Sequence, residues 1–86
     1  MNAPTRHQVA ETFGIVLRTA RDAAGLSQEQ LAEAADVDRT YPSLLERGLR
    51  QPTLYVILRL AAAAGMEPGW LVSAAAAALN LPPPSR

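Results

Sequence analysis

The stretch SQEQLAEAADVDRTYPSLLERGLR, residues 27–50, predicts two short helices joined by a tight corner. Ser27 and Gln30 have the Ser-x-x-Gln spacing of a capping box, in which each side chain accepts a hydrogen bond from a backbone N–H at the start of a helix. Leu31 and Ala35 follow at the spacing of one buried helical face. Two such helices, joined by about three or four residues, form a helix-turn-helix unit, whose second helix can enter the major groove of DNA.

The second helix of this unit is expected to span residues 39–47. Asp38 offers a side-chain cap at its start, and Gly48 ends it, because glycine readily adopts the left-handed conformation found just past a helix. Pro42 is unusual here, since proline would remove the first intrahelical N–H bond and disfavours the α conformation in the residue before it. We therefore expect this helix to begin late, with residues 39–41 looser or turned outward.

The rest of the chain predicts three more helices, at residues 6–24, 54–64 and 68–79. Gly25 and Gly65 end the first two of these, and Thr53 caps the second. Gly14, inside the first, costs that helix about 1 kcal/mol relative to alanine.

No segment has the alternating pattern of a β-strand, so we predict an all-α fold, a five-helix orthogonal bundle. The bundle forms a single domain over residues 1–86, with a core at about 6–79 and tails at 1–5 and 80–86.

Composition narrows the class of protein. A chain of 86 residues buries only about 60% of its unfolded surface, so pairing with a second copy is a natural source of added stability. The absence of cysteine excludes disulfides and thiolate metal sites. No apolar leader run is present, and the apolar runs around residues 54–58 and 70–81 fall well short of the roughly 20 residues of a membrane-spanning helix. We expect a soluble, cytoplasmic protein that does not contact membranes.

The formal net charge is zero, but the charges are unevenly distributed. Arg39, Arg47 and Arg50 fall in one short segment whose only acid is Glu46. Every basic residue in the chain is arginine, which makes forked contacts to phosphate and guanine. This clustering favours a nucleic-acid partner despite the neutral total.

The longer stretch GLSQEQLAEAADVDRTYPSLLERGLRQPT, residues 25–53, resembles the XRE type of helix-turn-helix domain, the class of phage repressors and Cro proteins. Ser-Gln, Leu-Ala, Glu-Arg-Gly and Gln-Pro-Thr all fall in register, and the resemblance extends over about residues 13–71. Within that class, DRTYPSLLERGLRQPT is most similar to the controller proteins of restriction-modification systems. The resemblance implies a lambda-repressor-like bundle that binds double-stranded DNA and regulates transcription.

The resemblance also implies which residues contact DNA. A glutamine at the start of the first helix of the unit would bind a phosphate, and the N-terminal half of the second helix would face the major groove. The expected contacts are Gln28, Arg39, Thr40, Tyr41, Ser43, Leu44, Arg47 and Arg50. Arg39 suits a bidentate contact to guanine, and Arg47 and Arg50 suit phosphates.

Several of these positions keep a second interpretation. Gln28 could simply be solvated, Arg39 and Thr40 could form an exposed first turn, and Tyr41 could pack against the core. Leu44 departs from the polar residue usual in base-reading relatives, so it either meets a thymine methyl group or takes no part in readout.

Two further sets of residues are assigned structural roles. By resemblance, Arg21 pairs with Glu46 and ties the reading helix to the scaffold. Trp70, near the start of an alanine-rich helix, suits an interface anchor, although it could instead close the protomer's own core. The expected homodimer interface comprises Tyr55, Trp70, Leu71, Ala74, Ala75 and Ala78. Two-fold symmetry would place the reading helices about 34 Å apart on a pseudo-palindromic operator.

The sequence offers little for catalysis. His7 is the only histidine, with no nucleophile or metal-binding set around it, and there is no glycine-rich phosphate loop. We predict that the protein is not an enzyme and that it has no cofactor, metal or small-molecule ligand. Two alternatives to a DNA-binding regulator remain. One is a protein-interaction module that has lost base reading, and the other is an antitoxin whose partner grips the C-terminal helix.

Overall fold

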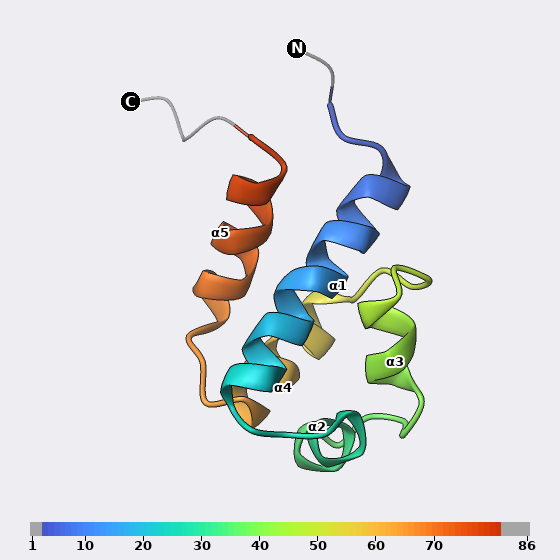
Figure 1. Ribbon diagram of the computed structural model, residues 1–86, viewed down its shortest axis with the longest axis vertical. Coiled ribbons are helices and arrows are strands. Elements are labelled where there is room, and N and C mark those ends of the chain that lie inside the picture. The colour runs from blue at the N-terminus through green and yellow to red at the C-terminus, as the bar shows by residue number, and fades with distance from the viewer. Residues whose placement is uncertain (1–2, 82–86) are drawn as a thin grey trace.

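The structure, a computed structural model, describes residues 3–81, and within that range it contains five helices and no strands. The helices are α1 (Arg6–Ala23), α2 (Gln28–Ala35), α3 (Tyr41–Glu46), α4 (Leu54–Ala63) and α5 (Pro68–Ala78). In Figure 1, α1 runs along the long axis with α5 on one side and α3 on the other, while α2 crosses below and α4 lies behind. The predicted all-α bundle is confirmed.

The helix starts follow from local sequence. The capping box predicted at Ser27 is present, with Gln30 N donating to Ser27 Oγ at 3.0 Å and Ser27 N donating to Gln30 Oε1 at 2.8 Å. A second capping box, between Thr5 and Gln8, starts α1 in the same way and was not anticipated. Each box satisfies two backbone N–H groups that have no partner inside the helix.

Five leucines, one from each helix, are fully buried and meet in a single core. They are Leu17, Leu31, Leu45, Leu60 and Leu71. Removing a side chain of this size from water stabilises the fold by roughly 1.5–3 kcal/mol. This shared contact therefore determines how the five short elements are held against one another.

The helix predicted at residues 39–47 is shorter, spanning Tyr41–Glu46. The Asp38 carboxylate does not cap it. Instead Asp38 Oδ1 accepts hydrogen bonds from Thr40 N at 2.9 Å and Thr40 Oγ1 at 2.6 Å, which fold residues 38–40 into a turn. The predicted late start is confirmed, with Thr40 in the N-cap position, but the expectation that Tyr41 is looser or turned outward was wrong. Tyr41 is the first residue of α3 and packs against the core.

The effect predicted for Pro42 was partly wrong. Pro42 is the second residue of α3, where a backbone N–H has no intrahelical partner in any case, so proline removes no helix bond. Its ring is fully buried. Pro42 therefore supplies core contact at a place where its missing donor costs nothing.

Gly14 has a role that helix propensity alone did not reveal. A Cβ at this position would lie 2.7 Å from the carbonyl oxygen of Glu46 and also too close to that of Leu45. Glycine thus allows the backbones of α1 and α3 to approach closely. The lower helix propensity of glycine in α1 is offset by the close packing of α3 against α1.

Candidate nucleic-acid interface

The corner between α2 and α3 is held by its own residues and by one arginine from another helix. Asp36 ends α2 in the left-handed conformation, at φ 56°, and Val37 packs against the core. From α4, Arg59 Nε donates to the backbone oxygen of Ala35 at 2.6 Å, and its guanidinium approaches Asp36 Oδ2 at 3.4 Å. Arg59 thus stabilises the carbonyl end of α2. No local pattern in the sequence points to this residue, because the contact joins two helices distant in the chain.

The ion pair between Arg21 and Glu46 is formed. Arg21 Nε donates to Glu46 Oε2 at 2.7 Å and Arg21 Nη2 to Glu46 Oε1 at 3.0 Å, a two-point contact. The side chains are only 11% and 4% exposed, respectively. The hydrogen bonds that Arg21 donates to the Glu46 carboxylate raise the pKa of Arg21 above its ordinary value. The last residue of α3 is therefore fastened to α1.

Gln28 joins the same network. Its Nε2 donates to Glu46 Oε1 at 3.0 Å, so the amide at the start of α2 is linked to the end of α3. The side chain is half-buried. This contact orients Gln28 and disfavours the interpretation of a freely solvated glutamine.

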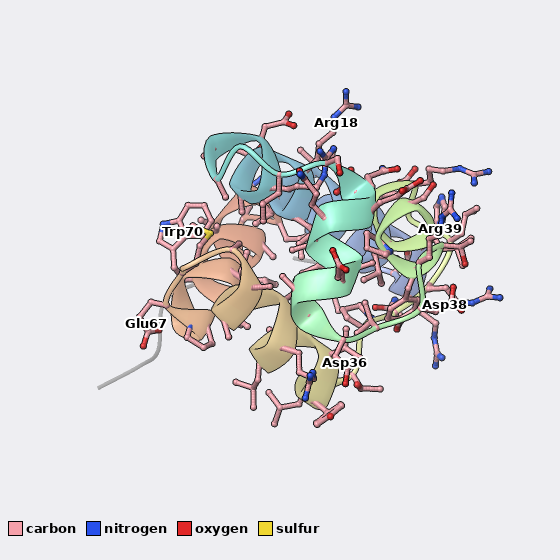
Figure 2. All side chains as sticks on the ribbon, turned by 90° about the horizontal axis from the view of Figure 1, so that it is seen from below. Arg18, Asp36, Asp38, Arg39, Glu67 and Trp70 are labelled. Atoms are coloured by element: carbon pink, nitrogen blue, oxygen red, sulfur yellow. The ribbon has the colours of Figure 1, made fainter. Side chains whose placement is uncertain are left out.

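The remaining expected DNA contacts divide by exposure. Arg39, Thr40, Arg47 and Arg50 are exposed, whereas Tyr41, Ser43 and Leu44 are half-buried. Tyr41 packs against the core cluster, in agreement with its second interpretation. Arg39 and Asp38 lie at one edge of the molecule in Figure 2, away from Trp70 at the opposite edge.

Two of the exposed arginines make hydrogen bonds within the chain. Arg39 Nη2 donates to Glu29 Oε2 at 2.8 Å, and Arg50 Nη1 donates to the backbone oxygen of its neighbour Leu49 at 3.2 Å. Both guanidinium groups retain N–H groups that can bond an acceptor on a ligand. The arrangement suits an anionic surface such as a DNA backbone and groove.

The expected dimer surface requires a correction. Leu71 is 0% exposed and Ala75 only 8%, because these two residues, four apart, form the face of α5 that packs into the protomer's own core. Neither is available to a partner. Ala74 is half-buried against the same core.

The other expected dimer residues remain accessible. Trp70 is 45% exposed, Tyr55 is 64% exposed, and Ala78 is exposed at the end of α5. Tyr55 is already engaged within the protomer, because its hydroxyl accepts a hydrogen bond from Arg59 Nη1 at 3.0 Å and the Arg59 guanidinium lies 5.5 Å from its ring centroid.

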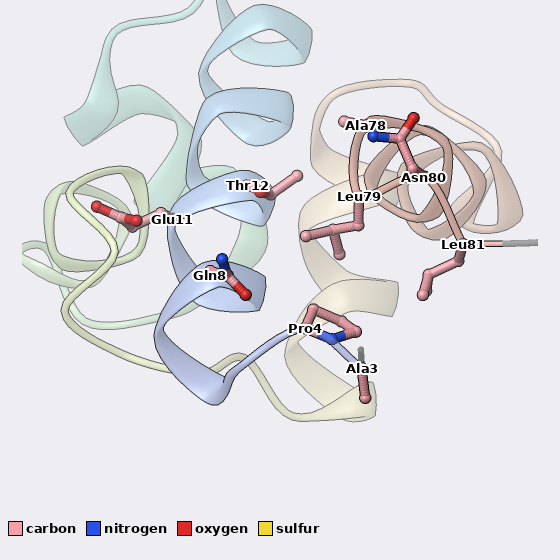
Figure 3. Close-up of a pocket in the computed structure, with 9 residues that line it drawn as sticks. All are labelled: Ala3, Pro4, Gln8, Glu11, Thr12, Ala78, Leu79, Asn80 and Leu81. Carbon is pink, nitrogen blue, oxygen red and sulfur yellow. The ribbon is translucent and has the colours of Figure 1, made fainter. Parts of the chain in front are cut away.

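A depression of about 500 Å³ lies away from this edge, between the start of α1 and the end of α5 (Figure 3). Its lining mixes the polar side chains of Gln8, Glu11 and Asn80 with Pro4 and Leu79. Among residues 3–81 no group of histidine, cysteine or acidic side chains is arranged to hold a metal ion. Nor, in the same range, is any helix long and apolar enough to cross a membrane.

Comparison with known proteins agrees with this geometry. Residues 12–75 match the family described as "Helix-turn-helix domain". An uncharacterised HTH-type transcriptional regulator of Mycobacterium tuberculosis is 42% identical over 50 residues, which is 58% of this chain and 36% of that protein. The chain thus spans about a third of the length of this relative.

Two solved structures are also similar. The restriction-modification controller protein C.AhdI from Aeromonas hydrophila is 47% identical, with a TM-score of 0.70 covering 72% of this chain and 94% of the controller. The clp gene regulator ClgR from C. glutamicum is 29% identical, with a TM-score of 0.77 covering 93% of this chain and all of the regulator chain (100%). The chain therefore belongs to the helix-turn-helix domain family, a class of DNA-binding proteins rather than enzymes.

Proposed function

We propose that the protein is a sequence-specific regulator of transcription that binds double-stranded DNA as a homodimer. The observation that carries this proposal is the position of Arg39, 77% exposed at the start of the segment leading into α3. Behind it, α3 is fastened to α1 by the buried Arg21–Glu46 pair and the close approach at Gly14. A rigidly supported arginine is well suited to reading guanine in the major groove.

In this proposal the remaining side chains position the protein on the duplex. Arg47 and Arg50, exposed at the end of α3 and just beyond it, neutralise phosphates. Gln28, held by Glu46, presents the start of α2 to the DNA backbone. Thr40 and Ser43 bond base edges or phosphates, while the half-buried Tyr41 and Leu44 offer only their outer atoms, suited to apolar contact with a thymine methyl.

The homodimer uses the accessible part of α5, with Trp70 as anchor and Ala74 and Ala78 allowing close approach. Tyr55 on α4 is the other accessible residue of the expected interface. A two-fold arrangement presents two reading segments about 34 Å apart, which fits a pseudo-palindromic operator.

Control of a restriction-modification operon is the biological setting we propose, since the similar protein C.AhdI is such a controller. The protein would then act in the cytoplasm, as a repressor or activator according to where its operator lies in the promoter.

The function is tested by letting the protein select the duplexes that it binds from a random DNA pool. Its affinity for the selected duplex is then measured at several salt concentrations. If two protomers each place Arg47 and Arg50 on phosphates, affinity should fall about a hundredfold between 50 and 200 mM salt. Arg47→Ala with Arg50→Ala should flatten this dependence. Arg18→Ala is the matched control, because Arg18 is an exposed arginine of α1 near Asp22, at 3.9 Å. Failure to recover any preferred duplex would refute the proposal.

A protein-interaction module or an antitoxin is the second candidate, and apolar exposure on α4 favours it. Leu54, Tyr55 and Leu58 are 69%, 64% and 46% exposed, respectively. Such a protein would bind its partner with little dependence on salt and would recover no preferred duplex.

A further inference from the structure

Each of three polar side chains expected to contact DNA is bonded to a carboxylate of the same chain. Gln28 donates to Glu46, Thr40 donates to Asp38, and Arg39 donates to Glu29. The first bond lies in the partly buried network that supports α3, and the second shapes the turn before that helix. The third bond has no evident part in supporting the fold, because Glu29 and Arg39 are both exposed side chains.

The Arg39–Glu29 contact uses only part of the guanidinium. Nη2 donates to Glu29 Oε2 at 2.8 Å, and among residues 3–81 no other hydrogen bond from the Arg39 side chain occurs. Arginine has five N–H donors in a planar fork, so a bidentate contact to guanine remains open while Glu29 holds Nη2. The bond to Glu29 removes rotational freedom that the long side chain would otherwise lose on binding.

We infer that Glu29 is a positioning residue for Arg39 and thereby sets the preference for guanine at one operator position. This inference rests on the proposed function. Glu29 itself does not contact DNA; it orients the guanidinium from the first turn of α2, so that the arginine is already placed when the duplex arrives. A loosely held arginine would reach phosphates and guanine alike and would discriminate less.

Simple charge repulsion gives the opposite expectation. Glu29 is an anion near a polyanionic ligand, so its neutralisation should raise affinity for every duplex if repulsion were its only effect. Glu33 provides the matched comparison. It is exposed on α2 and borders the same surface depression as Glu29 and Arg39, but makes no ion pair within residues 3–81.

The experiment compares Glu29→Gln with Glu33→Gln on the duplex that wild type selects from a random pool. The guanine in question is the base pair whose preference disappears in Arg39→Ala. We expect Glu29→Gln to bind the selected duplex about two- to fivefold more weakly and to lose a similar factor of discrimination at that guanine, as exposed ion pairs allow. Glu33→Gln should bind as well as wild type or better and keep its discrimination.

A double-mutant cycle isolates the coupling. In the Arg39→Ala background, Glu29→Gln should no longer weaken binding, because the side chain that it orients is gone. Melting curves of each variant confirm that the fold is retained.

Several results would overturn the inference. One is that Glu29→Gln tightens binding to all duplexes as Glu33→Gln does, and another is that discrimination at the guanine is unchanged. The inference would also be overturned if Arg39→Ala removed no guanine preference at any position. The proposed DNA binding would still stand in that case. Recovery of no preferred duplex at all would refute the proposed function, and the inference with it.

Discussion

The two helices at opposite edges of the bundle, α3 and α5, are stabilised in different ways. α3 has six residues, too few to be stable alone, and it depends on contacts from α1 and α2. α5 has eleven residues, including a run of alanines, the residue with the highest helix propensity. The helix that presents the expected DNA contacts thus depends on its surroundings alone, whereas the expected dimer helix adds a high intrinsic helix propensity to its packing against α1 and α4.

This difference teaches where mutations should act. The position of α3 rests on three features: the buried ion pair to Glu46, the absence of a side chain at Gly14, and the buried surfaces of Leu45 and Pro42. A change in any of these features should make residues 39–44, which carry the expected base contacts, less firmly held. Equivalent changes in α5 should be tolerated, except at its core residues Leu71 and Ala75.

The largest effect is expected from Arg21→Ala. It leaves the partly buried Glu46 carboxylate without its cationic partner and with only the Gln28 amide as a donor, so the free energy of unfolding should fall by about 3 kcal/mol. Arg18→Ala, on the same helix but exposed, should change it by less than about 0.5 kcal/mol. Urea unfolding of both variants measures the difference. Equal midpoints would mean that the buried pair contributes nothing to the attachment of α3.

Gly14→Ala should come next, lowering stability by about 1–3 kcal/mol because the new methyl group meets backbone oxygens of α3 that cannot move freely. Gly69→Ala in α5 is the control. There the new methyl group would meet only a side-chain oxygen of Glu67, at 2.9 Å, which can shift within its cap on Gly69 N more easily than backbone can, so stability should change by less than about 1 kcal/mol. The melting temperatures of both variants, monitored by circular dichroism, measure the difference. Equal melting temperatures would contradict this expectation.

Trp70→Ala tests α5 as a dimer surface. Trp70 is 45% exposed, so we expect the dimer to dissociate about tenfold more readily while the protomer stays folded. Sedimentation equilibrium over a range of concentrations measures this. Val72→Ala is the control, since Val72 is an exposed apolar residue of the same helix outside the expected interface. If Trp70→Ala left the dissociation of the dimer unchanged, the dimer interface would lie elsewhere than on α5.

The smallest effect concerns pH and the turn before α3. Hydrogen bonds from the Thr40 hydroxyl and then from its backbone N–H lower the pKa of Asp38 below its ordinary value of 3.8. A depressed folded-state pKa means that this contribution to stability is present above pH of about 4 and is lost as pH falls through the folded value.

The difference in stability between wild type and Asp38→Asn should therefore shrink as pH is lowered from 5 toward 2. Urea unfolding of both proteins across this range measures it, and the subtraction removes the titration of the other acids. A constant difference across the range would show that the Thr40 contacts do not favour the ionised form.

The sequence was most informative where structure depends on neighbours in the chain. The capping box that starts α2, the cap at Thr53 and the left-handed glycine at residue 25 were all predicted from local patterns, and the structure agrees. The capping box at Thr5 could have been found by the same rule that found the one at Ser27. Agreement is good here because capping bonds join residues only three apart.

The predictions were weakest where a side chain has two possible environments. Leu71 and Ala75 were assigned to a dimer surface because an apolar helix face gives the same pattern whether it meets its own core or a partner. The roles of Gly14 and Arg59, and the contact of Arg39 with Glu29, were missed for a related reason. Each depends on which helices lie side by side.

By itself, the amino-acid sequence determined the class of this protein: five helices, the corner between α2 and α3, and the arginines clustered within residues 39–50. Helix periodicity, caps and family motifs are local and can be read without a fold. The tertiary structure alone decided that α3 begins at Tyr41, that α5 turns Leu71 inward, and that an acid from α2 holds Arg39. Those outcomes depend on burial and on distances between residues far apart in the chain, which are set only when the core closes.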